Sequence, residues 1–288
     1  MPFAMIGFVL GCLYYKYSLQ HLSDSAGSLS HVETLDTRLL LYKLICVIVC
    51  MITARNAAMA FNRYIDRKYD EKNPRTAIRE IPSGIITPKN ALLFVLINCA
   101  VFILATWFIN KLCFFLSPVA LAVILGYSLT KRFTFLCHMI LGIGLGLAPI
   151  GAFLAVAGHF AVTPVLFSFA VFSWVSGFDI IYALQDEQFD KENLLYSIPS
   201  YFGQEKAKWI ARILHVLAFA FILFIGFYGN FSLMYWLGCV VFGSLLLYQH
   251  YIVYRYGMQK IDLAFFTMNG IASILFGLCV ITDIIMHF

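Results

Sequence analysis

The chain has 288 residues, of which 61% are hydrophobic and 12% are charged, and its formal net charge is +5. Soluble domains carry roughly 25% charged residues, so a soluble fold is excluded because too little polar sequence remains to cover its surface. Apolar stretches recur along the whole chain without a Pro/Ser-rich or highly charged linker, which predicts one transmembrane domain over residues 1–288. We therefore expect the lipid bilayer as its surroundings and no nucleic-acid partner.

Nine stretches are long and apolar enough to span a bilayer, since a helix needs about 20 such residues to cross ~30 Å of hydrocarbon. They are residues 3–20, 40–61, 90–109, 112–130, 134–157, 161–183, 209–228, 230–250 and 262–287. The first has no basic residues before it and no small-residue cleavage site after it, so we expect a helix and not a secretory signal peptide. The sequence predicts an all-α integral membrane protein, a bundle of about nine transmembrane helices.

Basic residues mark alternate connections between the predicted spans. Fifteen of the 20 lie in the connections after spans two, four, six and eight or at the adjoining helix ends: Arg63, Arg67, Lys68, Lys72, Arg75, Arg79 and Lys89; Lys131 and Arg132; Lys191, Lys206, Lys208 and Arg212; Arg255 and Lys260. Cytoplasmic loops carry an excess of Lys and Arg, so these connections and the amino terminus are predicted to be cytoplasmic. We expect a multi-pass protein of the inner (cytoplasmic) membrane.

Oxygen-bearing side chains repeat at helical spacing where the second predicted span ends. Asn62, Asp66 and Asp70 are four residues apart, which places them on one helix face over about 12 Å. Carboxylates at this spacing repel one another. We therefore expect a cation beside them.

A second acidic cluster follows the sixth predicted span. Asp179, Tyr182, Asp186 and Asp190 are separated by steps of three and four, so a continuous helix would carry all four on one face. Asp179 lies within apolar sequence, where an ionisable residue is costly and indicates a functional site.

The ligand types in the two clusters favour magnesium. They are hard oxygens with no His or Cys among them, which suits Mg²⁺ and argues against zinc. The eight cysteines lie in apolar stretches without a C-x-x-C pair, and we expect them to pack as small apolar residues. Mg²⁺ held by a few carboxylates keeps positions for phosphate oxygens. The clusters therefore predict a bound diphosphate.

Basic residues that complement a diphosphate lie on the same predicted side of the membrane. Arg75 and Arg79 follow the first cluster, and Lys131 and Arg132 end the fourth span. Arginine binds phosphate oxygens in bidentate fashion and lysine as a point charge. The alternative for each residue alone is an anchor near lipid headgroups.

Three segments together resemble the UbiA superfamily of membrane prenyltransferases. The first is Asn62-x-x-x-Asp66-x-x-x-Asp70 with Arg75-Thr76-x-x-Arg79 after it. The second is Asp179-x-x-Tyr182-Ala183-x-x-Asp186-x-x-x-Asp190, and between the two lies Tyr127-Ser128-Leu129-Thr130-Lys131-Arg132-Phe133-Thr134. The resemblance covers residues 55–203 and keeps the order and spacing of the motifs.

The resemblance implies a nine-helix bundle with a cytoplasmic-side cavity that binds an allylic diphosphate through Mg²⁺ and opens laterally to lipid. It implies that Mg²⁺ and diphosphate are held by Asn62, Asp66, Asp70, Asp186 and Asp190. Lys131 and Arg132 would also bind the phosphates. The substrate cavity would be lined by Arg55, Tyr127, Asp179 and Tyr182. The branch that prenylates 4-hydroxybenzoate is most similar. The implied reaction is Mg²⁺-dependent transfer of a polyprenyl group from polyprenyl diphosphate to a small aromatic acceptor in quinone biosynthesis, with the five aspartates catalytic.

One alternative acceptor fits the sequence as well as 4-hydroxybenzoate does, and two alternative classes of protein fit it less well. A naphthoate acceptor on the route to menaquinone is not separated from 4-hydroxybenzoate by anything in the chain. A secondary transporter also uses intramembrane carboxylates, but its charges lie near the bilayer midplane, whereas here most charges lie at span ends. A CDP-alcohol phosphotransferase would carry an Asp-Gly-x-x-Ala-Arg signature, which is absent.

Overall fold

The computed structural model describes residues 2–25 and 37–287, so most of the connection between the first two predicted spans lies outside the described residues. Within these ranges the chain is helical, and the long helices are α1 (Pro2–Ser25), α2 (Thr37–Asp70), α3 (Pro88–Ile109), α4 (Lys111–Thr130), α5 (Cys137–Ala157), α6 (Val162–Ala183), α9 (Gln204–Tyr228), α10 (Leu233–Tyr256) and α11 (Asn269–His287). A 3-10 turn (Leu184–Asp186), α7 (Glu187–Glu192) and α8 (Ile198–Phe202) connect α6 to α9, and a 3-10 turn (Gly257–Lys260) and a π-helical segment (Leu263–Met268) precede α11.

Eight of the described helices are long and apolar enough to cross a membrane, namely α2 to α6 and α9 to α11, with α6 counted together with its continuation to Glu192. In the ninth, the unbroken helix α1, Tyr14, Tyr15 and Lys16 interrupt the apolar sequence, yet the first turns are buried, with Ile6 at 0% exposure. The predicted all-helical membrane bundle of about nine helices is confirmed.

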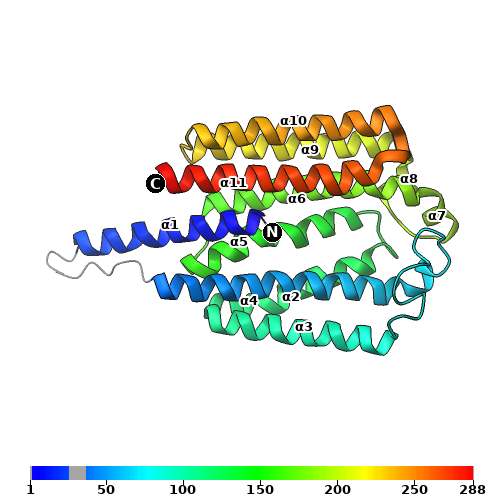
Figure 1. Ribbon diagram of the computed structural model, residues 1–288, viewed down its shortest axis with the longest axis horizontal. Helices are drawn as coiled ribbons and strands as arrows, with labels where there is room; N and C mark the ends of the chain where they lie inside the picture. The colour runs from blue at the N-terminus through cyan, green and yellow to red at the C-terminus, as the bar shows by residue number, and fades with distance from the viewer. Residues whose placement is uncertain (1, 26–36, 288) are drawn as a thin grey trace.

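The helices lie side by side in two groups joined by α1 and α5 (Figure 1). On one side α6, α9, α10 and α11 pack around a core that includes Phe167, Phe242 and Phe276, none of which is exposed. On the other side α2, α3 and α4 form the second group. The contacts of α5 with α1, α4 and α6 tie the two groups together.

Small residues let α5 approach its neighbour α6 closely. A Cβ atom added at Gly142 would lie 2.7 Å from the Phe172 carbonyl oxygen and closer still to the Ser176 hydroxyl. Close contacts through small residues are the usual way in which membrane helices pack, because lipid gives no hydrophobic drive for their association. This packing fixes α5 against α6, which carries the second acidic cluster.

Polar groups far from the cluster end are satisfied within the bundle. The buried Asp283 of α11 accepts hydrogen bonds from the backbone N–H groups of Ser232 (2.8 Å) and Tyr235 (3.1 Å) and so caps α10. Lys43 donates to the Val156 carbonyl at 3.2 Å near the end of α5. Uncapped helix ends leave backbone groups without partners, so these two charged residues have structural roles.

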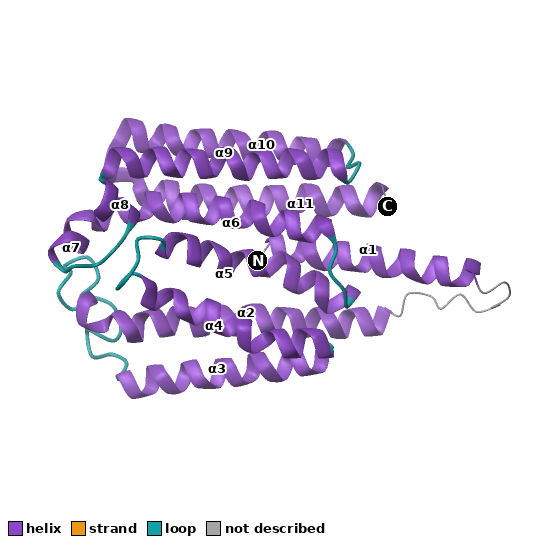
Figure 2. Ribbon diagram, turned by 180° about the vertical axis from the view of Figure 1, so that it is seen from behind, coloured by secondary structure: helices purple, strands orange, loops and turns teal. Residues whose placement is uncertain are grey.

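Both long polar connections lie at the same end of the bundle. Figure 2 shows the segment after α2 and the segment containing α7 and α8 next to each other at this end. The first segment begins with Asp70, whose carbonyl accepts a hydrogen bond from the Thr76 hydroxyl at 3.1 Å. It ends at Thr87, whose side chain accepts from the Asn90 N–H and caps α3. The fold thus brings together two acidic clusters that lie more than 100 residues apart in sequence.

Candidate active site

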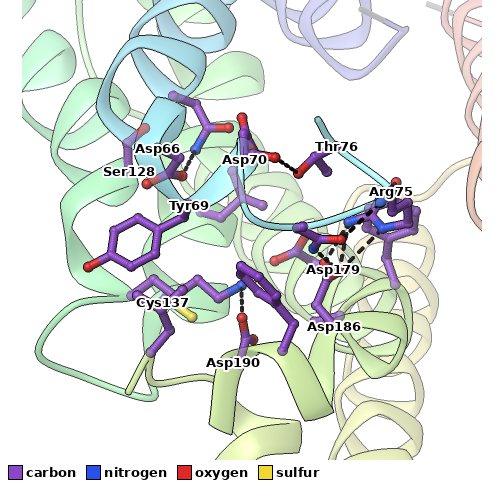
Figure 3. A pocket seen from close by; sticks show the side chains of 18 of the residues that line it. Asp66, Tyr69, Asp70, Arg75, Thr76, Ser128, Cys137, Asp179, Asp186 and Asp190 are labelled. Carbon is purple, nitrogen blue, oxygen red and sulfur yellow. Dashed lines mark hydrogen bonds and ion pairs between the residues drawn. The ribbon is translucent and has the colours of Figure 1, made fainter. Parts of the chain in front are cut away.

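A cavity of about 220 Å³ lies between these connections, walled by α2, α4, α5, α6 and α7 (Figure 3). Asp66 and Asp70 line one side, and Asp186 and Asp190 lie across from them. Small-molecule sites usually span roughly 300–1,000 Å³. The cavity as it stands therefore fits a polar headgroup and leaves no room for a long hydrocarbon chain.

The first cluster lies on one continuous helix, because α2 runs unbroken to Asp70. The Asn62 side-chain amide donates to Asp66 Oδ2 at 3.1 Å, which joins two successive turns on the cavity face. Asp66 Oδ1 lies 3.4 Å from the Arg132 guanidinium, which also donates to the Ile65 carbonyl at 2.8 Å. Arg132 thereby connects the end of α4 to the acidic face of α2.

The segment after α2 folds back over both clusters. Asn73 Oδ1 accepts the Arg75 N–H at 3.0 Å, which shapes the turn. The Arg75 guanidinium then reaches Asp186, with Nη2 to Oδ2 at 2.7 Å and Nη2 to Oδ1 at 2.9 Å, and donates to the Tyr182 hydroxyl at 3.1 Å. Arg79 turns the other way and meets Asp70 Oδ1 at 2.6 Å. One short segment therefore supplies a cation to each cluster.

The second cluster does not lie on one continuous helix, so that part of the prediction was wrong. Helix α6 ends at Ala183, a 3-10 turn covers Leu184–Asp186, and α7 begins at Glu187. The tighter winding after Ala183 shifts the following residues away from the face that a continuous α-helix would give them, because 3-10 geometry has three residues per turn instead of 3.6. Asp179, Tyr182, Asp186 and Asp190 nevertheless all line the cavity.

Asp190 is the most buried carboxylate of the site, with 0% exposure. Its Oδ1 lies 2.7 Å from Lys131 Nζ, and its Oδ2 accepts a hydrogen bond from the Ser197 hydroxyl at 2.9 Å. The Tyr196 N–H donates to the Lys131 carbonyl at 2.7 Å. The segment before α8 therefore holds both partners of the ion pair.

Four carboxylates thus each have one basic partner: Asp66 with Arg132, Asp70 with Arg79, Asp186 with Arg75, and Asp190 with Lys131. Burial alone lowers the pKa of Lys131, but the charge and hydrogen bond of Asp190 raise it by more, so this pKa lies above its ordinary value. Likewise, burial lowers the pKa of Arg75, and Asp186 raises it by more. Both side chains are therefore cationic near neutral pH.

The residues present fit a magnesium ion. Every polar ligand of the two clusters is an oxygen donor, which Mg²⁺ prefers. Asp70 Oδ2 is buried and has no hydrogen-bond partner, so a bound cation would satisfy it. Among the described residues, no three Asp, Glu, His or Cys side chains lie close enough together to form a metal-binding group. The carboxylates are engaged by Arg and Lys instead, and a metal ion would replace these cations.

Most residues that the sequence predicted for the site line this one cavity, including Tyr127, Arg75 and Arg79. Lys131 lines it directly, and Arg132 reaches it through Asp66. Arg55 does not line it. This residue is exposed and lies 11 residues before Asp66, which is three helical turns, so both share a face of α2 about 16 Å apart.

Sequence reasoning missed several residues that line or support the cavity. His138 lies in the first turn of α5 with Nδ1 2.7 Å from Asp179 Oδ2, and Asn73 donates to Asp186 at 3.4 Å. Ser197 holds Asp190. None of the three belongs to a spaced acidic motif, so periodicity gave no signal for them. His138 follows Lys131 by seven residues on the same predicted side, and that proximity was the only available sign.

Comparison with known proteins places this site in a family. The model of the UbiA prenyltransferase family matches residues 29–271. The 4-hydroxybenzoate octaprenyltransferase of Tolumonas auensis is 29% identical over 222 residues, which is 77% of each chain, and that of Citrobacter koseri is 30% identical over 222 residues, covering 77% of this chain and 76% of the relative.

Solved structures share the arrangement of the helices. The apo structure of a UbiA homolog from Aeropyrum pernix K1 superposes with a TM-score of 0.81 at 24% identity and covers 98% of this chain and 97% of that chain. A UbiA homolog from Archaeoglobus fulgidus bound to DMAPP and Mg²⁺ gives a TM-score of 0.66 at 18% identity, with coverages of 98% and 96%. Because the family match includes both acidic clusters and the segments that pair with them, we conclude that the chain belongs to the UbiA prenyltransferase family.

Proposed function

We propose that this prenyltransferase transfers a polyprenyl group from polyprenyl diphosphate to 4-hydroxybenzoate in quinone biosynthesis, with Mg²⁺ as its cofactor. The observation that carries the proposal is the set of four carboxylate–cation pairs around one headgroup-sized cavity. The names of the relatives support the acceptor. The Archaeoglobus fulgidus structure with DMAPP and Mg²⁺ supports the diphosphate and the metal.

The four pairs suit a substrate that carries both signs of charge. A magnesium diphosphate offers a cation to the carboxylates and an anion to the basic residues, so each partner of an existing pair finds a replacement. Asn62, Asp66, Asp70, Asp186 and Asp190 would hold Mg²⁺. Arg75, Arg79, Lys131 and Arg132 would then bind the phosphates. No charge is left unpaired inside the protein, which matters because a lone buried charge costs several kcal/mol.

The chemistry follows from these positions. Bound Mg²⁺ supplies Lewis-acid neutralisation of the diphosphate. Arg75 and Lys131, both cationic near neutral pH, stabilise the negative charge that develops on the diphosphate as its bond to the allylic carbon breaks. The aromatic ring attacks that carbon, and Asp179, the one cavity aspartate of the motifs without an Arg or Lys partner among the described ion pairs, accepts the proton that the ring loses. Tyr127 and Tyr182 line the cavity beside it.

Arg55 is our proposed binding residue for the acceptor carboxylate. It is exposed on the cluster face of α2, about 16 Å deeper in the membrane than Asp66. An exposed arginine at this depth is costly in lipid. The separation leaves room for a diphosphate, the allylic carbon and a benzoate ring in line.

Product analysis by mass spectrometry tests the function. Purified protein in lipid nanodiscs is incubated with geranyl diphosphate or a longer polyprenyl diphosphate, Mg²⁺, and either 4-hydroxybenzoate or a dihydroxynaphthoate. We expect prenylated 4-hydroxybenzoate, and loss of product when EDTA removes Mg²⁺. Product from the naphthoate alone would overturn the proposed acceptor, and no product from either acceptor would overturn the proposed reaction.

The same assay separates the acceptor site from the diphosphate site. Arg55→Leu should raise KM for 4-hydroxybenzoate about tenfold or more, because a charge-assisted hydrogen bond contributes about 1.5–3 kcal/mol. KM for the prenyl diphosphate should stay unchanged. Lys89→Leu, which removes an exposed basic residue of α3, is the matched control. A rise in KM for the diphosphate alone would contradict the assignment of Arg55.

We infer further that the cavity faces the cytoplasm and that the protein resides in the inner membrane. Both polar connections at the cavity end are rich in Lys and Arg, in agreement with the positive-inside rule. A C-terminal alkaline phosphatase fusion should then be active in a bacterial host, because α11 runs away from the cavity end. An inactive phosphatase beside an active cytoplasmic reporter at the same position would reverse this orientation.

A further inference from the structure

Asp179 is held differently from the four carboxylates described above. Its Oδ2 lies 2.7 Å from Nδ1 of His138, whereas Asp66, Asp70, Asp186 and Asp190 meet Arg or Lys. Asp179 is partly exposed, at 22% for the side chain, and both it and His138 line the cavity. Figure 3 draws Asp179 among the side chains that line the cavity; Asp179 lies on α6, whereas Asp186 lies in the 3-10 turn that follows.

The backbone around His138 determines which ring nitrogen carries the proton. His138 is 3% exposed, and its Nε2 lies 3.4 Å from the N–H of Ile198. A backbone N–H can only donate, so Nε2 is the acceptor and the proton lies on Nδ1. The imidazole therefore donates its Nδ1 hydrogen to Asp179.

The position of Ile198 is itself fixed by the site. Ile198 is the first residue of α8, and the preceding Ser197 forms a capping box with Ser200. The Ser197 hydroxyl also donates to Asp190. Just before this segment Leu194 has a φ of 55°, a strained conformation for a leucine, which marks a tight change of direction in the chain. One short segment thus orients Asp190 directly and Asp179 through His138.

We infer that His138 is a positioning residue that holds the Asp179 carboxylate ready to accept the proton of the acceptor ring, an inference that rests on the proposed function. In that step the ring carbon forms a bond to the allylic carbon, and the allylic carbon–oxygen bond breaks with its electron pair going to the diphosphate. The ring carbon then loses its hydrogen as a proton to Asp179, which later releases it to water. Because His138 occupies Oδ2, Oδ1 is left for the proton.

Two amide substitutions distinguish positioning from simple filling of space. The side-chain nitrogen of asparagine, a donor, lies the same number of bonds from the backbone as Nδ1, and the side-chain oxygen of glutamine, an acceptor, lies the same number of bonds away as Nε2. His138→Asn therefore keeps a donor toward Asp179 and gives up the acceptor for Ile198. His138→Gln keeps an acceptor for Ile198 and gives up the donor toward Asp179. His138→Leu removes both.

The test is steady-state kinetics of prenyl transfer with all three variants. We expect His138→Asn to keep kcat within about threefold, and His138→Gln and His138→Leu to lose about 10²-fold in kcat, the size of effect typical when a supporting hydrogen bond or an acid–base group is disturbed. KM for the prenyl diphosphate should remain within about twofold, because no diphosphate ligand has changed. In an Asp179→Asn background, His138→Leu should cause no further loss, since the group that it positions is already gone.

Several results would overturn the role of His138. These are wild-type kcat in His138→Gln, an equal loss in the Asn and Gln variants, or a loss that appears in KM for the diphosphate instead of kcat. If His138→Leu fails to fold, the Asn and Gln pair still decides the question because both side chains are polar and similar in size to histidine. A wild-type protein without prenyl transfer would instead overturn the proposed function and this role with it.

Discussion

Replacing Asp66 or Asp186 by asparagine is expected to lower kcat/KM for prenyl transfer by about 10³-fold, the scale seen when a group that stabilises developing charge is removed. Each substitution keeps the size of the side chain and removes one negative charge. It also leaves the former partner, Arg132 or Arg75, free to hold the diphosphate without its metal. The loss should therefore appear in kcat and in the Mg²⁺ dependence, measured as product formed across a Mg²⁺ titration.

Each cluster is followed within two residues by a glutamate whose substitution serves as a matched control. Glu71→Gln removes an exposed carboxylate just after Asp70, and Glu192→Gln removes one at the end of α7. Neither side chain lines the cavity. Both controls should transfer the prenyl group at the wild-type rate and with wild-type Mg²⁺ dependence. Near-normal turnover in Asp66→Asn or Asp186→Asn would contradict the assignment of the two clusters.

The first cluster was predictable because its geometry is local. Four-residue spacing places Asn62, Asp66 and Asp70 on one face of any helix that contains them, and α2 continues far enough to do so. The bundle was predictable for a similar reason, since the length of each apolar run is set by the bilayer. Membership of the UbiA prenyltransferase family confirms the prenyltransferase prediction over the secondary transporter.

The pairing of charges was not predictable, because it depends on how two irregular segments fold over the bundle. Arg75 reaches Asp186 across 111 positions of sequence, and the turn that directs it is set by a hydrogen bond from its own N–H to Asn73. The 3-10 turn after α6 was missed for the same reason. Helical periodicity continues through it in the sequence, and its tighter winding becomes apparent only in the folded chain.

His138 shows a second limit of sequence reasoning. Its functional partner, Asp179, lies on another helix, and its tautomer is set by Ile198 on a third segment. No spacing rule connects these three residues. An isolated histidine at a helix start is therefore recognised as part of the site only when α5, α6 and α8 are seen together.

The pair of Lys131 and Asp190 offers the largest expected effect on stability. Lys131→Met leaves the fully buried Asp190 carboxylate without its cation, with only the Ser197 hydroxyl as a hydrogen-bond partner. Breaking a buried pair in this way costs about 3–5 kcal/mol, and we expect the lower end because Lys131 is 31% exposed. The midpoint of thermal unfolding in detergent should fall clearly, and prenyl transfer should be lost.

The double variant Lys131→Met/Asp190→Asn separates stability from catalysis. With both charges gone, no lone ion remains in the interior, and the unfolding midpoint should return most of the way to the wild-type value. Prenyl transfer should not return, since a proposed Mg²⁺ ligand and a phosphate-binding cation are both missing. Lys191→Met is the control, because Lys191 is 52% exposed and its i,i+4 pair with Glu187 contributes under about 1 kcal/mol. A double variant as unstable as Lys131→Met alone would show that the uncompensated charge is not the cause, and an active double variant would remove both residues from the reaction.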